Sequence, residues 1–227
     1  MSKHTIKLAL AATALLAAPA LWAQPAGSWL VRAGAINITP DVDSGNLTAP
    51  NFGSAEGTRI DIKSKSQLGG GITYMLTDHI AVDVPLAPPF KHRIVGAGRI
   101  DGVGTIGTIK ALPATVVAQY RFNEPTAAFR PYVGAGLTYA YFFKQKMNGT
   151  FNGLTGGTPG ASTTSKTDNK LAPMLQIGAS YAFNERWFID GSISKAWLKT
   201  TSHLSSGQRI SYRLDPWVFA IGVGYRF

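Results

Sequence analysis

The sequence has no cysteine, and only 15% of its 227 residues are charged. Without cysteine, the chain cannot form a disulfide-stabilised secreted module or a metal site with thiolate ligands. Acidic residues are scarce, 12 against 22 basic ones, so the formal net charge is +10. This balance is typical of proteins that bind nucleic acid or an anionic surface, and composition alone does not decide between them.

A long hydrophobic run of the kind that forms a membrane helix is missing beyond residue 32. Residues 1–23 resemble a secretory signal peptide, since Lys3 and Lys7 precede an apolar segment and small residues lead to a predicted cleavage after Ala23, or alternatively after Ala20. The apolar segment is too short to span a bilayer about 30 Å thick. Cleavage leaves a net charge of +8, and export excludes nucleic acid as a partner.

Apolar side chains recur at every second position in what remains, which is the pattern of β-strands. Val133, Ala135, Leu137, Tyr139 and Tyr141 share one face of such a run. Eight runs of this kind are recognisable, at about residues 28–40, 68–76, 80–87, 115–122, 133–143, 174–183, 187–198 and 217–227.

The connections between these runs alternate in length. Short turns are expected at 77–79, 123–128 and 184–186, and long loops at 41–65, 88–111, 144–170 and 199–213. Tight turns on one side, long loops on the other, an even number of strands and aromatic residues at the strand ends indicate an outer-membrane barrel. The sequence therefore predicts an all-β fold in which residues 24–227 form an eight-stranded antiparallel up-and-down transmembrane β-barrel. A secreted sandwich or a lipocalin-like barrel is the soluble alternative.

Several short motifs resemble the OmpW family of bacterial outer-membrane proteins. They are WLVRAG at 29–34, TYMLTD at 73–78, PFKH at 89–92, LPAT at 112–115, FRPYVGAG at 129–136, FF at 142–143, RLDPWVF at 213–219 and GYRF at 224–227. The resemblance covers essentially the whole chain after the signal peptide. It implies an eight-stranded barrel in the outer membrane of a Gram-negative bacterium, with a narrow apolar interior linked to the entry of small hydrophobic molecules. The terminal Phe227 resembles the signal read by the outer-membrane assembly machinery.

Residues between the lipid-facing ones are expected to point into the barrel. Toward the outside they are apolar, which predicts a lumen open to the outside that accepts a small hydrophobic ligand. We expect this lumen to be lined by Ile36, Ile38, Pro85, Val117, Phe142, Met174 and Val218. A fully packed interior is the alternative.

Near the periplasmic end the inward residues are charged. We expect Arg32, Arg121 and Arg226 to pair with Asp83 and Asp190 and to plug this end, because an unpaired buried charge costs several kcal/mol.

A closed lower end requires another exit. Prolines gather at Pro88, Pro89 and Pro113, where each removes a hydrogen-bond donor from the wall. The sequence thus predicts a lateral opening into the membrane there, with an ordinary loop boundary as the alternative.

Signals for catalysis are weak. The glycine pattern at 102–107 lacks the strand–helix context of a dinucleotide site, and the histidines of the exported chain lack metal-ligand spacing. His203 beside Ser202 and Ser205 is the nearest approach to a hydrolase site. We therefore expect no enzyme activity, no cofactor and no metal.

The whole +8 charge falls in the four long connections. Lipopolysaccharide phosphate is the anionic partner expected on that side. The alternative function is a structural or adhesive barrel whose basic loops bind lipopolysaccharide or a surface partner.

Overall fold

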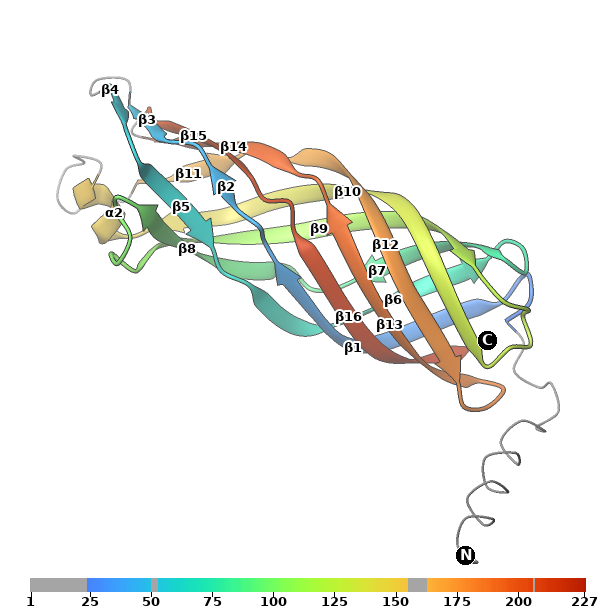
Figure 1. Cartoon of the computed structure of the whole chain (residues 1–227). Coiled ribbons are helices and arrows are strands. Elements are labelled where there is room, and N and C mark those ends of the chain that lie inside the picture. Colours follow the sequence, from blue (N-terminus) through green and yellow to red (C-terminus); the bar gives the residue numbers. More distant parts are fainter. Residues whose placement is uncertain (1–23, 50–52, 155–162, 206) are drawn as a thin grey trace, which may run out of the picture.

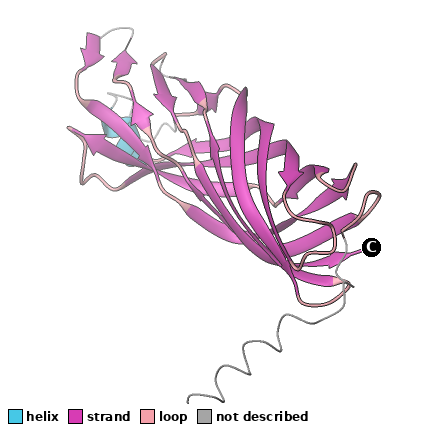
Figure 2. Cartoon of the chain, turned by 45° about the vertical axis from the view of Figure 1, so that its right-hand side comes forward, coloured by secondary structure: helices cyan, strands magenta, loops and turns pink. Residues whose placement is uncertain are grey.

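The computed structural model describes residues 24–49, 53–154, 163–205 and 207–227 (Figure 1). The predicted signal peptide at 1–23 lies outside the described residues, as does part of the long connection at 144–170. Strands dominate the described chain, with one short helix, α2 (Gly149–Leu154) (Figure 2). None of the helices in these ranges is long and apolar enough to cross a membrane.

Eight strands form the wall of a closed antiparallel barrel. Neighbours in the chain pair with one another, and β1 pairs with β16 from Leu30 opposite Arg226 to Thr39 opposite Trp217, which closes the ring. The fold predicted from the sequence is therefore confirmed. The wall strands are β1 (Trp29–Thr39), β6 (Lys65–Met75), β7 (Ile80–Leu86), β9 (Thr105–Arg121), β10 (Phe129–Met147), β12 (Lys170–Ala182), β13 (Trp187–Ala196) and β16 (Trp217–Arg226).

Side chains alternate between the two faces of this wall, as the two-residue repeat requires. On β16 the outward Trp217, Phe219 and Ile221 are 42%, 43% and 59% exposed although all three are apolar. On β12 the inward Met174 and Gln176 are buried. An apolar outer face and a buried, partly polar inner face are what contact with lipid demands.

The two ends of the barrel differ. Short turns, residue 24 and the C-terminus share one end, where the Phe227 amide donates to the Trp29 carbonyl at 2.9 Å (Figure 1). At the other end the four long connections continue the barrel as β-structure. They contain β2 (Asp43–Ser44), β3 (Leu47–Ala49), β4 (Gly53–Ala55), β5 (Thr58–Ile62), β8 (Phe90–Gly98), β11 (Ser165–Thr167), β14 (Lys199–Leu204) and β15 (Arg209–Arg213). We call these strands, α2 and the adjoining ends of β9 and β10 the outer extension.

The prediction of long loops was wrong for most of the outer extension. β8 pairs with β5 and β9, and β14 pairs with β11 and β15, so much of the expected loop sequence continues the sheets. The inward residues of these strands pack into an apolar cluster that includes Ile94, Phe142, Ile210 and Tyr212. Their outward residues are largely polar, since this part of the wall faces water, and polar sequence resembles loop sequence.

Candidate functional site: a central cavity above a charged network

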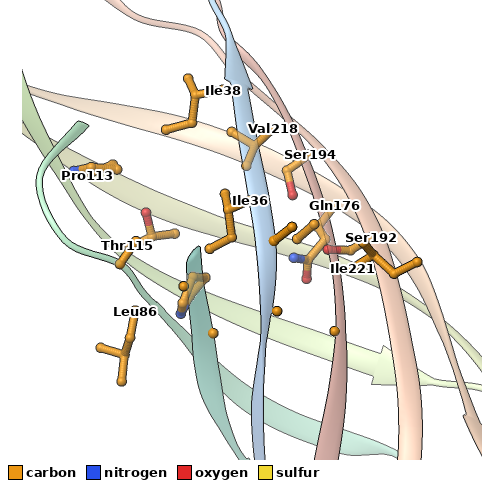
Figure 3. A pocket seen from close by; sticks show the side chains of 18 of the residues that line it. Ile36, Ile38, Leu86, Pro113, Thr115, Gln176, Ser192, Ser194, Val218 and Ile221 are labelled. Carbon is orange, nitrogen blue, oxygen red and sulfur yellow. The ribbon is translucent and has the colours of Figure 1, made fainter. Parts of the chain in front are cut away.

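A cavity of about 110 Å³ lies inside the barrel and is bounded by residues of all eight wall strands (Figure 3). Eight-stranded barrels leave room for their own side chains or for one small ligand. An engineered apolar cavity of about 150 Å³ in another protein holds benzene, so this space is on the scale of a small organic molecule. The apolar part of its lining includes Ile36, Ile38, Pro85, Leu86, Ala87, Phe90, Pro113, Met174, Ala196, Val218 and Ala220.

Most of the residues expected to line the lumen border this central cavity. Ile36, Ile38, Pro85, Met174 and Val218 do so. The remaining two are buried elsewhere in the interior. Val117 packs with Met174 and Ala196, and Phe142 belongs to the apolar cluster of the outer extension. Strand alternation identified their inward facing, but it could not show how far along the barrel the open space extends.

The floor of the cavity is an ion pair between β1 and β7. Arg32 donates from both terminal nitrogens to the two Asp83 carboxylate oxygens, each at 2.8 Å, and from Nη1 to Thr73 Oγ1 at 2.9 Å. The Arg32 Nε lies 3.6 Å from Asp190 Oδ1. Asp190 also accepts from the Tyr132 hydroxyl, at 3.0 and 3.2 Å to its two oxygens. Asp83 is thus paired with the Arg32 guanidinium, and Asp190 is hydrogen-bonded to the Tyr132 hydroxyl.

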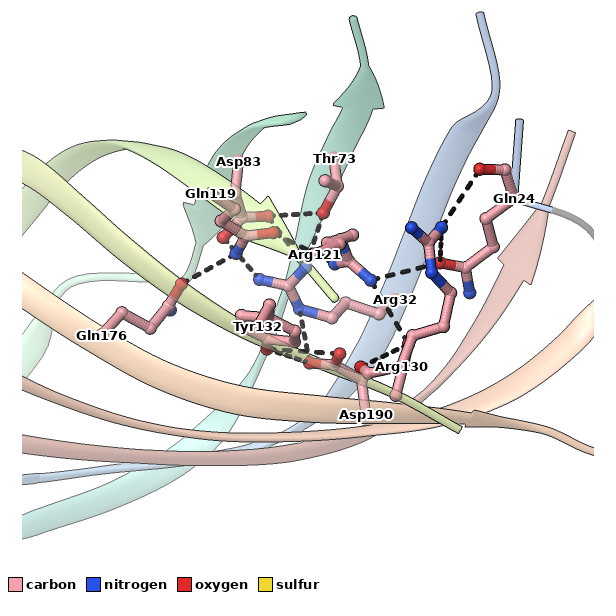
Figure 4. A network of polar contacts seen from close by, with 11 residues as sticks. Gln24, Arg32, Thr73, Asp83, Gln119, Arg121, Arg130, Tyr132, Gln176 and Asp190 are labelled. Carbon is pink, nitrogen blue, oxygen red and sulfur yellow. Dashed lines mark hydrogen bonds and ion pairs between the residues drawn. The ribbon is translucent and has the colours of Figure 1, made fainter. Parts of the chain in front are cut away.

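A second arginine lies below this pair and has no carboxylate within hydrogen-bond distance among the described residues. Arg121 is fully buried and donates to Gln119 Oε1 at 3.0 Å, to Gln24 Oε1 at 3.2 Å and to Ser180 Oγ at 3.3 Å (Figure 4). Its guanidinium carbon stands 4.6 Å from the centre of the Tyr132 ring. Neutral acceptors and a ring face therefore contact this guanidinium, while its Nε has no hydrogen-bond partner among the described residues.

A third arginine closes the short-turn end. Arg130 donates to the backbone carbonyls of Asp78 and Asn123, which belong to two different turns. It also donates to the backbone carbonyl of Gln24 in the N-terminal segment (Figure 4). The backbone amide of Gln24 donates to the Pro125 carbonyl at 2.8 Å. These hydrogen bonds hold residue 24 across the short-turn end of the barrel. We call Arg32, Asp83, Arg121, Arg130, Tyr132 and Asp190, with the amides and hydroxyls that they contact, the lower network.

The structure brings together four of the five residues expected in the plug. Arg32, Asp83, Arg121 and Asp190 meet in the lower network, whereas Arg226 is half-buried at the end of β16 and makes no ion pair within the described chain. Sequence reasoning missed Arg130, Tyr132 and Gln24. The alternation that placed Val133 on the lipid face already implied that Tyr132 points inward. No comparable signal marked Gln24, because it lies in no strand.

The wall of the barrel is interrupted beside the cavity. β7 pairs with β9 only from Ile80 opposite Tyr120 to Asp83 opposite Val117. Pairing on that edge of β9 resumes with β8, at Phe90 opposite Ala111. Between these two points, residues 84–89 and 112–116 share no recorded ladder in the described structure. We call this stretch the wall gap.

The predicted lateral-opening prolines lie at the wall gap. Pro113 borders both the gap and the cavity, and residues 88–89 connect β7 to β8. The cavity lining also includes Leu86, whose side chain is 49% exposed on the lipid face. The cavity thus reaches the wall where the strand ladder is broken.

The outer side of the cavity is not the open lumen that the sequence suggested. Beyond Thr138 and Met174, the next inward residues Ala140 and Ala172 belong to the packed apolar cluster of the outer extension. A small second cavity of about 30 Å³ lies in this cluster, among Ile60, Ile94 and other residues. The upper interior is apolar, as expected, but side chains fill it.

No cluster of metal-binding side chains occurs in the described ranges. His203 lies 3.6 Å from the Asp168 carboxylate on the surface of the outer extension. The glycine pattern at 102–107 forms a turn that leads into β9, without a following helix.

Comparisons with known proteins agree over the whole chain. The model of the OmpW family matches residues 25–227. Outer membrane protein W of Escherichia coli (strain K12) is 37% identical over 230 residues, with all of both chains covered. The dibenzothiophene metabolism operon protein PahQ of Pseudomonas aeruginosa is 27% identical over 217 residues, 93% of each chain. The crystal structure of the outer membrane protein OprG from Pseudomonas aeruginosa matches with a TM-score of 0.80 and 27% identity, covering 90% of this chain and 98% of that one.

Proposed function

We propose, because this chain belongs to the OmpW family of Gram-negative outer-membrane proteins, that its barrel admits small hydrophobic molecules by passive diffusion. The family match and the full-length relatives make the chain a non-enzymatic β-barrel of the outer membrane. The substrate class and the route are the proposed part.

The observation that carries the proposal is the position of the central cavity. Its walls combine inward apolar residues such as Ile36 and Val218 with Leu86, which faces lipid at the wall gap. An apolar molecule in this space keeps the favourable free energy of leaving water, about 25 cal/mol per Å² of buried apolar surface. It can then move into the bilayer without crossing a polar region.

The lower network makes the lateral route the easier one. A molecule that continued toward the periplasm would have to part Arg32 from Asp83 and displace Arg121, both of which are buried. Exposing these charges to an apolar molecule costs several kcal/mol per ion. We therefore assign release to the wall gap beside Pro113.

The name of one relative supports the substrate class. The Pseudomonas aeruginosa protein belongs by name to a dibenzothiophene metabolism operon, and dibenzothiophene is a fused aromatic sulfur compound. An outer-membrane barrel in such an operon fits the uptake of an apolar substrate. The entry route from outside passes through the apolar cluster of the outer extension, whose aliphatic and aromatic side chains can change rotamer without breaking ion pairs.

Uptake of radiolabelled benzene by intact cells, with and without the protein, tests the proposal. We expect faster uptake with the protein and a loss of that gain in Val218→Phe, which adds a ring inside the cavity. Val223→Phe, on the lipid face of the same strand, is the matched control and should keep it. Equal uptake with and without the protein would refute the proposal.

A cross-link over the wall gap tests the exit. In Pro85→Cys/Thr115→Cys, two positions that border the cavity from β7 and β9, a short bifunctional maleimide would tie the strands together. We expect uptake to fall at least several-fold after cross-linking and to recover when a cleavable linker is cut. The control pair Ile193→Cys/Phe219→Cys joins a continuous ladder and should have no effect. Unchanged uptake in the cross-linked gap variant would rule out lateral release.

The alternative of a structural or adhesive barrel is favoured by one surface feature. Lys63, Lys65, Lys91 and Arg93 are all exposed and lie close together, because β5 and β8 pair at Ile62 opposite Ile94. We call these four residues the basic patch. Phosphate groups of lipopolysaccharide suit such a surface.

A further inference from the structure

The lining of the central cavity is not uniformly apolar. Thr115, Thr138, Gln176, Ser192 and Ser194 border it from β9, β10, β12 and β13. Ile36, Ile38 and Val218, on β1 and β16, belong to its apolar part. The labelled side chains in Figure 3 show Gln176, Ser192 and Ser194 grouped together on neighbouring strands. The cavity therefore has a polar wall as well as an apolar one.

The two threonines of the polar wall have partners within the protein. Their hydroxyl oxygens lie 2.9 Å apart, and Thr138 also donates to the Met174 sulfur at 3.4 Å. Thr138 donates to the sulfur and Thr115 donates to Thr138, so neither threonine has a hydroxyl hydrogen left to donate to a ligand.

The other three polar groups retain free capacity. Gln176 accepts from Gln119 Nε2 at 2.7 Å through its Oε1, which leaves its amide nitrogen as a donor toward the cavity. No contact is recorded in the described chain for the hydroxyls of Ser192 and Ser194. All three side chains are more than nine-tenths buried, with exposures of 4%, 8% and 5%. Among the described residues only Arg121 Nε is a fully buried side-chain polar atom without a partner, so these three groups are not sealed in the wall but open to the cavity that they line.

Strand register explains why the three groups act together. Gln176 on β12 lies directly opposite Ser194 on β13, and Ser192 lies two residues along β13 on the same face. Three adjacent hydrogen-bonding groups can therefore reach one polar atom of a molecule that fills the cavity. Hydroxyl groups can donate or accept, whereas the free amide nitrogen of Gln176 only donates.

The charges at the floor indicate that this polar atom is neutral. Arg32 is already bonded to Asp83 and lies near Asp190, so its positive charge is compensated. An ionised ligand would be desolvated here without a free counter-ion, which is costly. A hydroxyl or carbonyl group loses much less on entering, and the polar wall compensates that loss.

We infer that the cavity selects small neutral molecules with an apolar body and one hydroxyl or carbonyl group, such as phenols, over the corresponding hydrocarbons. The apolar wall of Ile36, Ile38 and Val218 takes the body, and Ser192, Ser194 and Gln176 bind the polar atom. This inference rests on the proposed function and narrows its substrate class.

Phenol and benzene test the inference, because they differ by one hydroxyl. The full-length protein in lipid nanodiscs, labelled at its methionine methyl groups, is titrated with each compound while the NMR signal of Met174, which borders the cavity, is followed. Partitioning into lipid is common to all variants, so the compared quantity is the ratio of the two dissociation constants. One neutral hydrogen bond corresponds to roughly a three- to tenfold preference for phenol.

We expect Ser192→Ala/Ser194→Ala to lose this preference and to keep its affinity for benzene. Ser211→Ala, at an exposed position of β15 outside the cavity lining, is the control and should keep the preference. If the double variant fails to fold, each single alanine variant should lower the preference in part. A wild type that does not prefer phenol, or a double variant that still does, would overturn the inference while leaving benzene uptake intact. Failure of both compounds to shift Met174 would overturn it too, and would contradict the proposed function independently of the serines.

Discussion

Asp83 is the residue on which the closed lower end depends most. It is fully buried, and its carboxylate holds both terminal nitrogens of Arg32 and the Thr73 hydroxyl. Asp43 forms an arginine pair with Arg213 at the surface, where both side chains are more than half exposed. The two pairs have the same chemistry in opposite surroundings, which makes them a natural comparison.

We predict that Asp83→Asn lowers the free energy of unfolding by about 3 kcal/mol, because it leaves the buried Arg32 without its main counter-ion. Asp43→Asn should leave stability unchanged, since water screens that pair. Urea unfolding in lipid vesicles, followed by tryptophan fluorescence, measures both variants. Equal stability of Asp83→Asn and the wild type would show that the lower network is held by its neutral hydrogen bonds instead.

For individual residues, the sequence predicted which side chains face into the barrel better than it predicted which of them contact one another. Alternation placed Arg32, Asp83, Arg121 and Asp190 inside, and the structure joins all four. Arg226 follows the same rule but lies too near the end of its strand to reach them. Depth along a strand depends on the stagger of the barrel, which a single strand's sequence does not encode.

Strand β8 is the element that shows best how the outer extension is held. It continues from β7 through Pro88 and Pro89, then pairs with β5 and β9 above the wall gap. His92 on this strand is buried, stacks on Phe90 and places its Nδ1 2.9 Å from the Lys63 carbonyl. Any opening of β8 away from β5 exposes this imidazole to water.

Burial lowers the pKa of His92 below its ordinary 6.5, with the Lys65 charge acting the same way and the Lys63 carbonyl opposing both. The folded strand pair therefore prefers the neutral ring. Once the pH falls below about 6.5, protonation favours the opened state, and stability drops further as the pH decreases. We predict weaker protection of the β5–β8 amides at pH 5.5 than at pH 7.5, measured by hydrogen exchange and expressed as free energies of opening.

His92→Gln should abolish this pH dependence, because its side chain does not titrate. His203→Gln removes an exposed histidine elsewhere in the outer extension and should leave the pH dependence unchanged. A pH dependence that survives in His92→Gln would assign the effect to another group.

The strands of the wall were predicted more accurately from the sequence than those of the outer extension. Wall strands such as β13 and β16 were predicted within a few residues, since contact with lipid makes most of their outward residues apolar. β14 and β15 were expected to be loops, because their outward residues include Lys199, Arg209 and Arg213. Outside the membrane, a strand needs apolar residues only on its inward face. Its outward residues are polar, so the sequence contains fewer hydrophobic residues by which the strand could be recognised.

At the scale of the whole molecule, the barrel is closed at both ends by different means. Charged and polar groups fill the lower end, and apolar packing fills the outer extension. Apolar packing can rearrange around an apolar molecule at little cost, whereas the ion pairs cannot separate without exposing charge. Under the proposed function, this asymmetry makes the wall gap an easier exit for an apolar molecule than the lower end.

The charge of the molecule is also unevenly distributed, and this leads to a last prediction. The basic patch lies where β5 and β8 of the outer extension meet the start of β6, whereas Arg186 is a basic residue of the short-turn end. An exposed Lys or Arg side chain near an anionic membrane surface contributes about 1 kcal/mol to binding, and we expect the phosphate groups of lipopolysaccharide to act in the same way on this patch. We predict that Lys91→Gln/Arg93→Gln weakens binding to lipopolysaccharide at least tenfold at low salt, measured by surface plasmon resonance on the full-length protein in nanodiscs.

Arg186→Gln should bind as the wild type does, and benzene uptake should persist in both variants, because neither change touches the cavity. Loss of uptake together with loss of lipopolysaccharide binding would mean that the two functions are one, with lipopolysaccharide holding the outer extension in its transporting form.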